Sequence, residues 1–213
     1  DTELRIIRNS RFENIVPSPF SYDIPFGGMA IRYVDSENKG ANGFHIEGNG
    51  KFSSGSPDFN NCIFGIFMTS RIAATVNTGT RTGITDCRFL GVHNGVFLSN
   101  NCGLTGTFTG SKNSFPRGGI WNNYIEVNPS TGDQYVQFVM PFSGIAITDF
   151  DPGQSAPEIW QNTIDINQDN TCGQSFGIRI TGATIFGQSL DQVDINKNNI
   201  NLNAGFAGIS LGN

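Results

Sequence analysis

Two short patterns alternate along this chain, and their recurrence constrains its fold more than any other feature does. The first is Gly-Φ-x-Φ, in which Φ is an aliphatic residue, Met or Phe. A chain of this composition would contain roughly two copies by chance. Seven are present, at 28–31, 43–46, 65–68, 95–98, 144–147, 177–180 and 208–211. Recurrence of this kind is typical of a protein built from repeated structural units.

The second pattern is Φ-x-x-[Asn/Cys/Ser]-x-Φ, and its central residues are Ser10, Cys62, Cys87, Asn123, Asn162 and Asn198. The apolar residues on both sides alternate with polar ones, as they do in a β-strand. The central residue is of a type found in bends, and Asn tolerates the left-handed conformation that such a bend requires. The long gap between Ser10 and Cys62 leaves room for a further irregular coil around 46–52.

The spacing of the two patterns predicts an all-β protein. No stretch of the chain reads as an amphipathic helix, and short strands separated by variable loops are typical of a solenoid or a sandwich. The recurrent triplet of strands favours the solenoid. With 213 residues the chain can form one domain with a sizeable core. We expect a single β-helix domain over 1–213, a segment of a longer chain, with long loops near 13–27, 99–118 and 128–143.

These triplets and bends resemble the right-handed parallel β-helix superfamily, which includes the pectate-lyase-like proteins. The resemblance covers nearly the whole chain and implies a right-handed, single-stranded parallel β-helix of about six to seven irregular coils. It implies that Gly-Φ-x-Φ is the first strand of each coil and that Asn123, Asn162 and Asn198 form an asparagine ladder. Cys62 and Cys87 would occupy the same ladder position one coil apart. Adjacent coils lie about 4.8 Å apart, which is compatible with a disulfide, but two stacked free thiols are the preferred interpretation.

In this superfamily carbohydrate usually binds on the outer face of the first strand, between its adjoining loops. Side chains alternate along a strand, so the x of Gly-Φ-x-Φ should point outward. This predicts outward positions for His45, Phe67, Phe97 and Arg179. Phe67 and Phe97 would then form a flat apolar platform for a sugar ring or a partner protein. The alternative is that a loop folds over the two rings and makes a small satellite core.

Three further candidates have chemistry of their own. Glu47 would point the same way as His45 and could orient its imidazole for catalysis. The planar guanidinium group of Arg179 could bind the carboxylate of a uronate sugar. Asp149 and Asp151 could share a calcium ion, which is the one cofactor that the residues suggest. Each candidate also has an ordinary reading: a surface ion pair, a solvated arginine and a plain Asp-Pro-Gly turn.

Several function classes are excluded or disfavoured. The net charge is −5 and no basic stripe exists, which argues against nucleic acid. No apolar run is long enough to insert into a membrane, and the four cysteines lack zinc-type spacing. The Asp-Asp and Gly-His-Gly motifs of polygalacturonases are absent, as is a phosphate loop. No Asn-x-Ser/Thr sequon is present, which favours a bacterial or viral source.

The leading hypothesis is a non-catalytic β-helix segment of a larger secreted or cell-surface protein of a bacterium or phage. It would serve as a stalk or adhesin and bind polysaccharide on its outer face. One alternative is a polysaccharide lyase or glycoside hydrolase, which rests on fold analogy. Another is a trimeric, phage tailspike-like receptor-binding protein. No capping helix is recognisable, so flanking domains or partner chains are expected to cover the helix ends.

Overall fold

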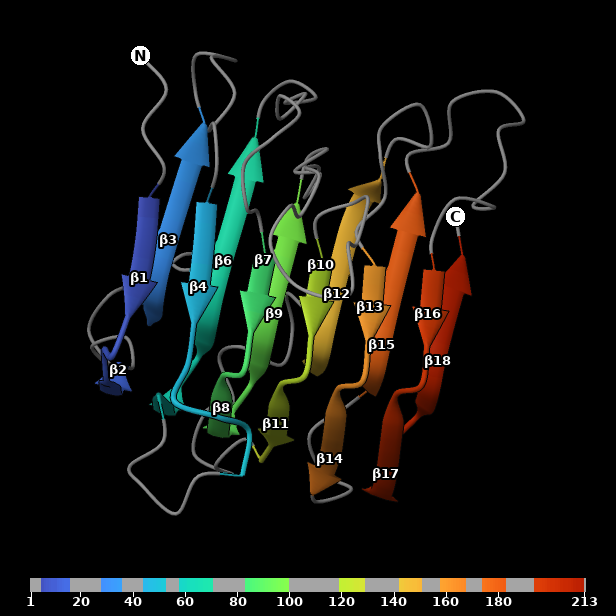
Figure 1. Cartoon of the computed structure of the whole chain (residues 1–213). Coiled ribbons are helices and arrows are strands. Elements are labelled where there is room, and N and C mark those ends of the chain that lie inside the picture. The colour runs from blue at the N-terminus through green and yellow to red at the C-terminus, as the bar shows by residue number, and fades with distance from the viewer. Residues whose placement is uncertain are drawn as a thin grey trace, which may run out of the picture.

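Three parallel β-sheets make up the described structure. The computed structural model describes residues 5–15, 28–35, 44–52, 58–70, 83–99, 119–128, 142–150, 158–167, 174–182 and 194–212. Eighteen strands and no helix lie within these ranges. Each sheet has six strands and takes every third strand of the chain, so strand triplets follow one another from β1–β3 to β16–β18 (Figure 1). This all-β arrangement is compatible with a parallel β-helix.

The three sheets, here called A, B and C, differ in strand length. Sheet A has short strands: β1 (Arg5–Arg8), β4 (Phe44–Glu47), β7 (Gly83–Thr85), β10 (Gly119–Trp121), β13 (Glu158–Trp160) and β16 (Asp194–Asn196). Sheet B contains β2 (Phe12–Ile15), β5 (Phe59–Cys62), β8 (Arg88–Val92), β11 (Tyr124–Val127), β14 (Thr163–Asn167) and β17 (Asn199–Ala204). Sheet C has the longest strands: β3 (Met29–Asp35), β6 (Phe64–Ser70), β9 (Asn94–Ser99), β12 (Phe142–Phe150), β15 (Ser175–Gly182) and β18 (Ala207–Gly212).

All but one of the Gly-Φ-x-Φ segments lead into or lie within strands of sheet C. The exception is 43–46, because β4 belongs to sheet A and pairs with β1 and β7. His45 and Glu47 are therefore not on the strand face where the sequence places them. The pattern is short, and it describes any strand that starts after a glycine. The long gap between Ser10 and Cys62 contains β2, β3, β4 and β5, and β4 is the regular first strand of the second triplet, so the expected further coil is not there.

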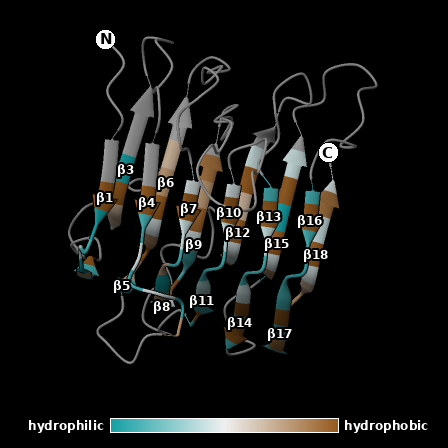
Figure 2. Cartoon of the chain, in the orientation of Figure 1, coloured by the Kyte–Doolittle hydropathy of each residue, from teal (hydrophilic) through white to brown (hydrophobic). Residues whose placement is uncertain are grey.

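Matching apolar residues fill the interior in columns. In sheet A the buried isoleucines of successive strands pair in register: Ile46, Ile84, Ile120 and Ile159. In sheet B the rings of Phe12, Phe59 and Phe89 stack nearly parallel, with centroids 5.2 and 4.5 Å apart. Each such aromatic pair adds about 0.5–1.5 kcal/mol beyond burial. Figure 2 shows hydrophobic bands along the strands and hydrophilic connections between sheets A and B.

The bends between sheets A and B place a left-handed residue immediately before the ladder position. Asp86, Asn122, Gln161 and Lys197 all have φ between 53° and 56°. Asn123, Asn162 and Asn198 are not among the residues with positive φ. The expectation that the ladder Asn itself adopts the left-handed conformation is therefore wrong. The strain of about 1–2 kcal/mol falls on the preceding residue instead.

The chain makes a detour between β4 and β5. Residues 48–52 cross the bends of later triplets (Figure 1). Lys51 Nζ donates a hydrogen bond to the Gln161 carbonyl at 2.5 Å, and the rings of Phe52 and Tyr124 lie 6.1 Å apart. Burial lowers the pKa of Lys51. The detour replaces the ordinary bend between sheets A and B in the second triplet.

The expected long loops overlap described strands at their ends. β2 extends to Ile15, inside the predicted loop 13–27, and β12 begins at Phe142, inside 128–143. The loop 99–118 starts at the last residue of β9. Apart from Asn128, which is described, the remainder of all three loops lies outside the described residues. In the described ranges, no helix is long and apolar enough to cross a membrane.

Candidate functional site

Asn123, Asn162 and Asn198 form a continuous hydrogen-bonded ladder in the bends between sheets A and B. Asn123 Nδ2 donates to Asn162 Oδ1 at 2.9 Å, and Asn162 Nδ2 donates to Asn198 Oδ1 at 2.9 Å. The backbone N–H groups of Asn123 and Asn162 donate to the same oxygens, at 3.1 and 3.0 Å. The Cys87 N–H donates to Asn123 Oδ1 at 2.9 Å and extends the ladder by one position. These amides are occupied in holding the coils together.

Cys62 does not share the ladder position of Cys87. Cys87 lies between β7 and β8, whereas Cys62 is the last residue of β5 and pairs with Ile15. The detour after β4 shifts the second copy of the bend pattern to the corner between sheets B and C, which explains the difference. Both residues are buried free thiols, and burial raises the pKa of each. Cys102 and Cys172 lie outside the described residues.

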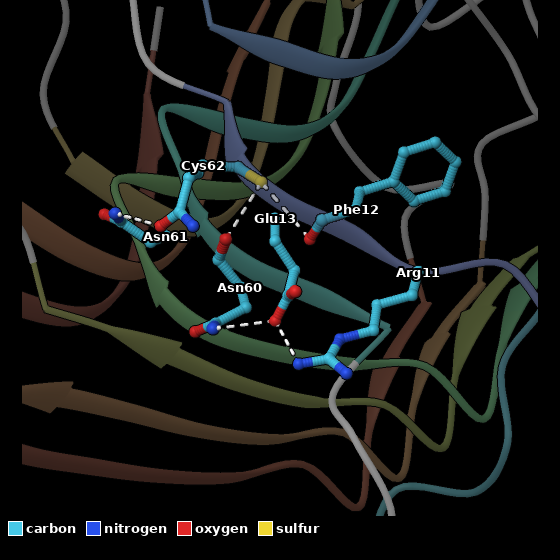
Figure 3. A network of polar contacts seen from close by, with 7 residues as sticks. Arg11, Phe12, Glu13, Asn60, Asn61 and Cys62 are labelled. Atoms are coloured by element: carbon cyan, nitrogen blue, oxygen red, sulfur yellow. Dashed lines mark hydrogen bonds and ion pairs between the residues drawn. The ribbon is translucent and has the colours of Figure 1, made fainter.

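The surroundings of Cys62 are polar and structural (Figure 3). Its Sγ lies 3.5 Å from the Asn60 carbonyl and 3.8 Å from the Phe12 carbonyl. On the neighbouring strand Glu13 accepts hydrogen bonds from Arg11 and, at 3.3 Å, from Asn60. The bond from Arg11 is the main cause that lowers the pKa of Glu13. The bonds from Cys62 to Phe12 and from Asn60 to Glu13 join neighbouring strands, and the other two join residues two apart in the chain.

Phe67 and Phe97 are buried, which corrects the expectation of an exposed aromatic platform. They pair in register on β6 and β9, and their rings stack 5.4 Å apart at an interplanar angle of 4°. The edge of the Phe64 ring contacts both. Each of the two rings is only 4% exposed and belongs to the hydrophobic core cluster. A sugar ring therefore has no access to them in this structure.

The other predicted site residues do not meet at one place. Arg179 lies on β15, half-buried, with its guanidinium carbon 5.4 Å from the centre of the Phe176 ring. His45 lies on β4 and Asp149 on β12, but the structure describes only the backbone of these two residues, and Asp151 lies outside the described ranges. The calcium and catalytic hypotheses built on them stay predictions. Among the described residues, no group of three potential metal ligands comes together.

Two tryptophans stand on adjacent strands on the outer face of sheet A, and neither is among the predicted site residues. Trp121 on β10 pairs in register with Trp160 on β13. Each follows a buried isoleucine, so alternation turns both side chains outward. Both are half-buried. Within the described residues, this is a pair of large aromatic side chains that adjacent strands hold at the surface.

Two glycines leave the space in which the Trp121 ring lies against the outer face of sheet A. A Cβ atom added to Gly83 would lie 2.5 Å from Trp121 Cη2, and one added to Gly119 would lie 2.6 Å from Trp121 Cε3. The indole ring therefore lies across the backbone of β7 and β10, where any larger residue would displace it. This packing gives a bulky ring one defined orientation on a rigid sheet.

Polar groups surround the two rings. Asn196, which is exposed, continues the row of Trp121 and Trp160 on one side, and Thr85, which is only 4% exposed, continues it on the other. Glu158 and Asp194 occupy the parallel row two residues earlier. Lys197 Nζ lies 5.2 Å from the centre of the Trp160 ring. Aromatic surface beside carboxylate and amide groups is the composition of a site for a ligand with both apolar and hydroxyl-bearing faces.

The sequence contains a signal for this platform. The segments Ile120-Trp121-Asn122-Asn123 and Ile159-Trp160-Gln161-Asn162 are equivalent copies of the bend pattern, and they hold both tryptophans of the chain. In both segments the tryptophan directly follows the first apolar residue of the pattern, and alternation along the strand turns this position outward. This position of the pattern identifies the pair.

Comparison of the chain with protein-family models, with curated proteins and with solved structures finds no match.

Proposed function

We propose that this chain is a right-handed parallel β-helix of the pectate-lyase-like superfamily, with six coils, that serves as a non-catalytic scaffold and binds polysaccharide on sheet A. Three parallel sheets that each take every third strand support this fold, as does the asparagine ladder. Crossovers between parallel strands are right-handed in nearly all proteins, which supports the handedness. The proposed site replaces sheet C, where Phe67 and Phe97 are buried.

The paired tryptophans are the observation that carries the binding function. Trp121 and Trp160 sit on adjacent strands, about 4.8 Å apart in the pairing direction. Rigid aromatic rings lose little conformational entropy when a ligand packs on them. The apolar C–H face of a sugar can lie on an indole ring while its hydroxyl groups reach the surrounding polar side chains.

The same scaffold would act on the surface of a bacterium or phage, and partner coils or chains would cover the end of the stack. Apolar side chains on the last strands support a covering partner. Ile209 and Leu211 on β18 are 48% and 56% exposed, and Leu202 on β17 is 41% exposed. They are the counterparts of interior residues in earlier coils.

Affinity electrophoresis in gels that contain soluble polysaccharides tests the proposal. We expect at least one neutral polysaccharide of a panel (hydroxyethyl cellulose, laminarin and dextran) to retard the wild-type chain. The double variant W121A/W160A should lose at least tenfold in affinity, and W121F/W160F should keep part of it. Phe52→Ala, which removes an exposed ring beside Tyr124 of sheet B, is the matched control and should bind like wild type.

Two results would contradict the proposal. One is that no polysaccharide of the panel retards the wild-type chain. The other is equal retardation of the wild type and W121A/W160A, with both folded by circular dichroism. Release of reducing ends or unsaturated products from the panel would instead favour the lyase or hydrolase alternative.

A further inference from the structure

We infer that the side chain of Lys197 occupies the ring face of Trp160 on which a sugar would pack, so that a bound glycan must displace it. Lys197 therefore limits the affinity of the tryptophan platform at its Trp160 end. This inference rests on the proposed function, because it assigns an affinity-limiting residue to the same site. It follows from the position of Lys197 in the last bend and from the place of its ammonium group.

Lys197 lies in the bend that follows β16, next to the strand that carries Trp160. Asn196, the residue before it, pairs in register with Trp160. Lys197 itself has a φ of 53° and is the left-handed residue of this bend. Its Nζ lies over the Trp160 ring, 5.2 Å from the ring centre. At this distance the negative face of an indole ring attracts an ammonium group. The chain thus places one of its own cations against the proposed binding surface.

The bend alone does not account for a lysine at this position. Asn and Asp tolerate the left-handed conformation better than other residues that have a side chain. Asp86 and Asn122 fill the equivalent position in two earlier bends, whereas Gln161 and Lys197 fill it beside Trp160. A lysine in this conformation is strained, and the attraction between its ammonium group and the Trp160 ring offsets part of that strain.

A sugar ring and an ammonium group compete for the same aromatic surface. The sugar packs on the ring through its apolar C–H groups, and the ammonium group is held there by the charge distribution of the ring. When a sugar packs on Trp160, the Lys197 ammonium group must leave and loses this attraction. At an exposed site that loss corresponds to a change of about two- to fivefold in a binding constant.

Lys197 can move aside without a change in the bend. Its side chain is exposed, and its flexible stem lets the ammonium group reach water in another conformation. Lys51, which lies at the same corner, is held differently. Its ammonium group donates a hydrogen bond to the Gln161 carbonyl, and burial lowers its pKa. For this reason we assign the competition with the glycan to Lys197.

Quenching of tryptophan emission locates the Lys197 ammonium group without any glycan. In a Trp121→Phe background, Trp160 is the remaining tryptophan of the chain. A cation at its ring attracts iodide and repels caesium, so we expect Lys197→Asn to lower the ratio of iodide to caesium quenching about twofold. Lys197→Arg, which keeps the charge, should leave the ratio unchanged. Arg32→Gln, which removes an exposed positive charge from β3 of sheet C, is the matched control and should behave like the background.

Affinity electrophoresis with hydroxyethyl cellulose, laminarin and dextran measures the effect on binding. For a polysaccharide that retards the wild-type chain, Lys197→Asn should bind about two- to fivefold more tightly. Lys197→Arg and Arg32→Gln should bind like wild type. Asn suits the bend, because Asn122 fills the equivalent position in an earlier coil. The variant therefore removes the ammonium group and keeps the left-handed conformation.

Two results with Lys197→Asn would overturn the inference. One is equal or weaker binding of the polysaccharide, which would mean that Lys197 does not compete with the glycan. The other is an unchanged quenching ratio, which would place the ammonium group away from the ring. If W121A/W160A binds polysaccharide like wild type, the proposed function is wrong and displacement of Lys197 falls with it. The quenching ratio then still decides whether Lys197 covers Trp160.

Discussion

Two neighbouring residues in each bend between sheets A and B have different roles, although the sequence pattern marks only one of the two positions. The left-handed residue, such as Asn122 or Gln161, turns the chain at the surface. The next residue, Asn123 or Asn162, points inward and is 0–1% exposed. A buried amide is stable there because its oxygen and nitrogen both find partners on neighbouring coils.

Asn162 is the central member of the ladder, and its replacement should be costly. In Asn162→Ala the N–H groups of Asn123 lose their acceptor and the Ile120 carbonyl loses its donor. Buried polar groups without partners cost about 1–3 kcal/mol each, so we expect the free energy of unfolding to fall by about 2–4 kcal/mol. Urea denaturation measures it. Asn201→Ala, which removes an exposed bond to Asp165, is the control and should change stability by less than about 0.5 kcal/mol. Equal losses in both variants would contradict the role of the ladder.

Asp58 should make stability depend on pH in an unusual direction for a carboxyl group. It is 4% exposed, and burial raises its pKa, although hydrogen bonds from the N–H groups of Arg88 and Asn49 oppose the shift. With a raised folded pKa, its contribution to stability is fully present below the unfolded pKa of about 3.9 and is lost as pH rises through the folded pKa.

The comparison of wild type with Asp58→Asn isolates this effect, because other titrations are common to both proteins. The difference in unfolding free energy, wild type minus variant, should be smaller at neutral pH than at about pH 3.5. Urea denaturation at the two pH values measures it. A difference that stays constant or grows toward neutral pH would show that burial does not dominate the environment of Asp58.

At the scale of elements, the outer face of sheet A depends on one position in each of the short strands β7 and β10 that has no side chain. Gly83 and Gly119 supply no side chain, and the Trp121 ring occupies the space above them. In β13 and β16 the equivalent residues are Glu158 and Asp194. Along this row of sheet A, two glycines that leave space for an aromatic ring are followed by two acidic residues.

Gly83→Ala should move the Trp121 ring and leave the fold in place. The added Cβ would meet Trp121 Cη2 at 2.5 Å, which is the far end of a side chain, while the nearest backbone atom is 3.0 Å away. In a Trp160→Phe background, emission reports on Trp121 alone, and we expect it to shift toward the wavelength of solvated tryptophan. Gly212→Ala, with no atom within 4 Å of the new Cβ, is the matched control. An unchanged spectrum for Gly83→Ala would mean that the ring does not rest on this glycine.

The whole molecule behaves as a stack in which each strand pairs only with strands of adjacent triplets. Interior residues of the middle coils are therefore covered on both sides, and Ile145 and Ile178 are fully buried. Ile209, their counterpart on β18, is 48% exposed. Open parallel edges beside exposed apolar side chains are sites of association.

We expect the 213-residue chain to self-associate through this end of the stack. Ile209→Lys combined with Leu211→Lys should lower the concentration-dependent rise in mass that analytical ultracentrifugation measures, because two charges would have to be buried. Ser210→Lys on the alternate face of the same strand is the control and should associate like wild type. Association that is equally strong in both variants would place the contact elsewhere.

The sequence alone determined the kind of fold. Period-2 alternation and regularly spaced bends are local properties, because a strand and a turn depend on their own residues. For this reason the segments of sheet C and the partners of Asn123, Asn162 and Asn198 could be read without coordinates. The same reasoning failed at 43–46 and at Cys62, where a short pattern fits two different sheets and only strand pairing distinguishes them.

Only the tertiary structure decided which aromatic residues remain at the surface. Alternation turns Phe67 and Trp121 outward by the same rule, yet Phe67 is 4% exposed and Trp121 is half-buried at the surface of sheet A. Exposure depends on everything that packs over a residue, including segments distant in the sequence, and no local pattern encodes it. The ladder therefore follows from spacing, whereas the tryptophan platform and its acidic border follow from the way the coils stack.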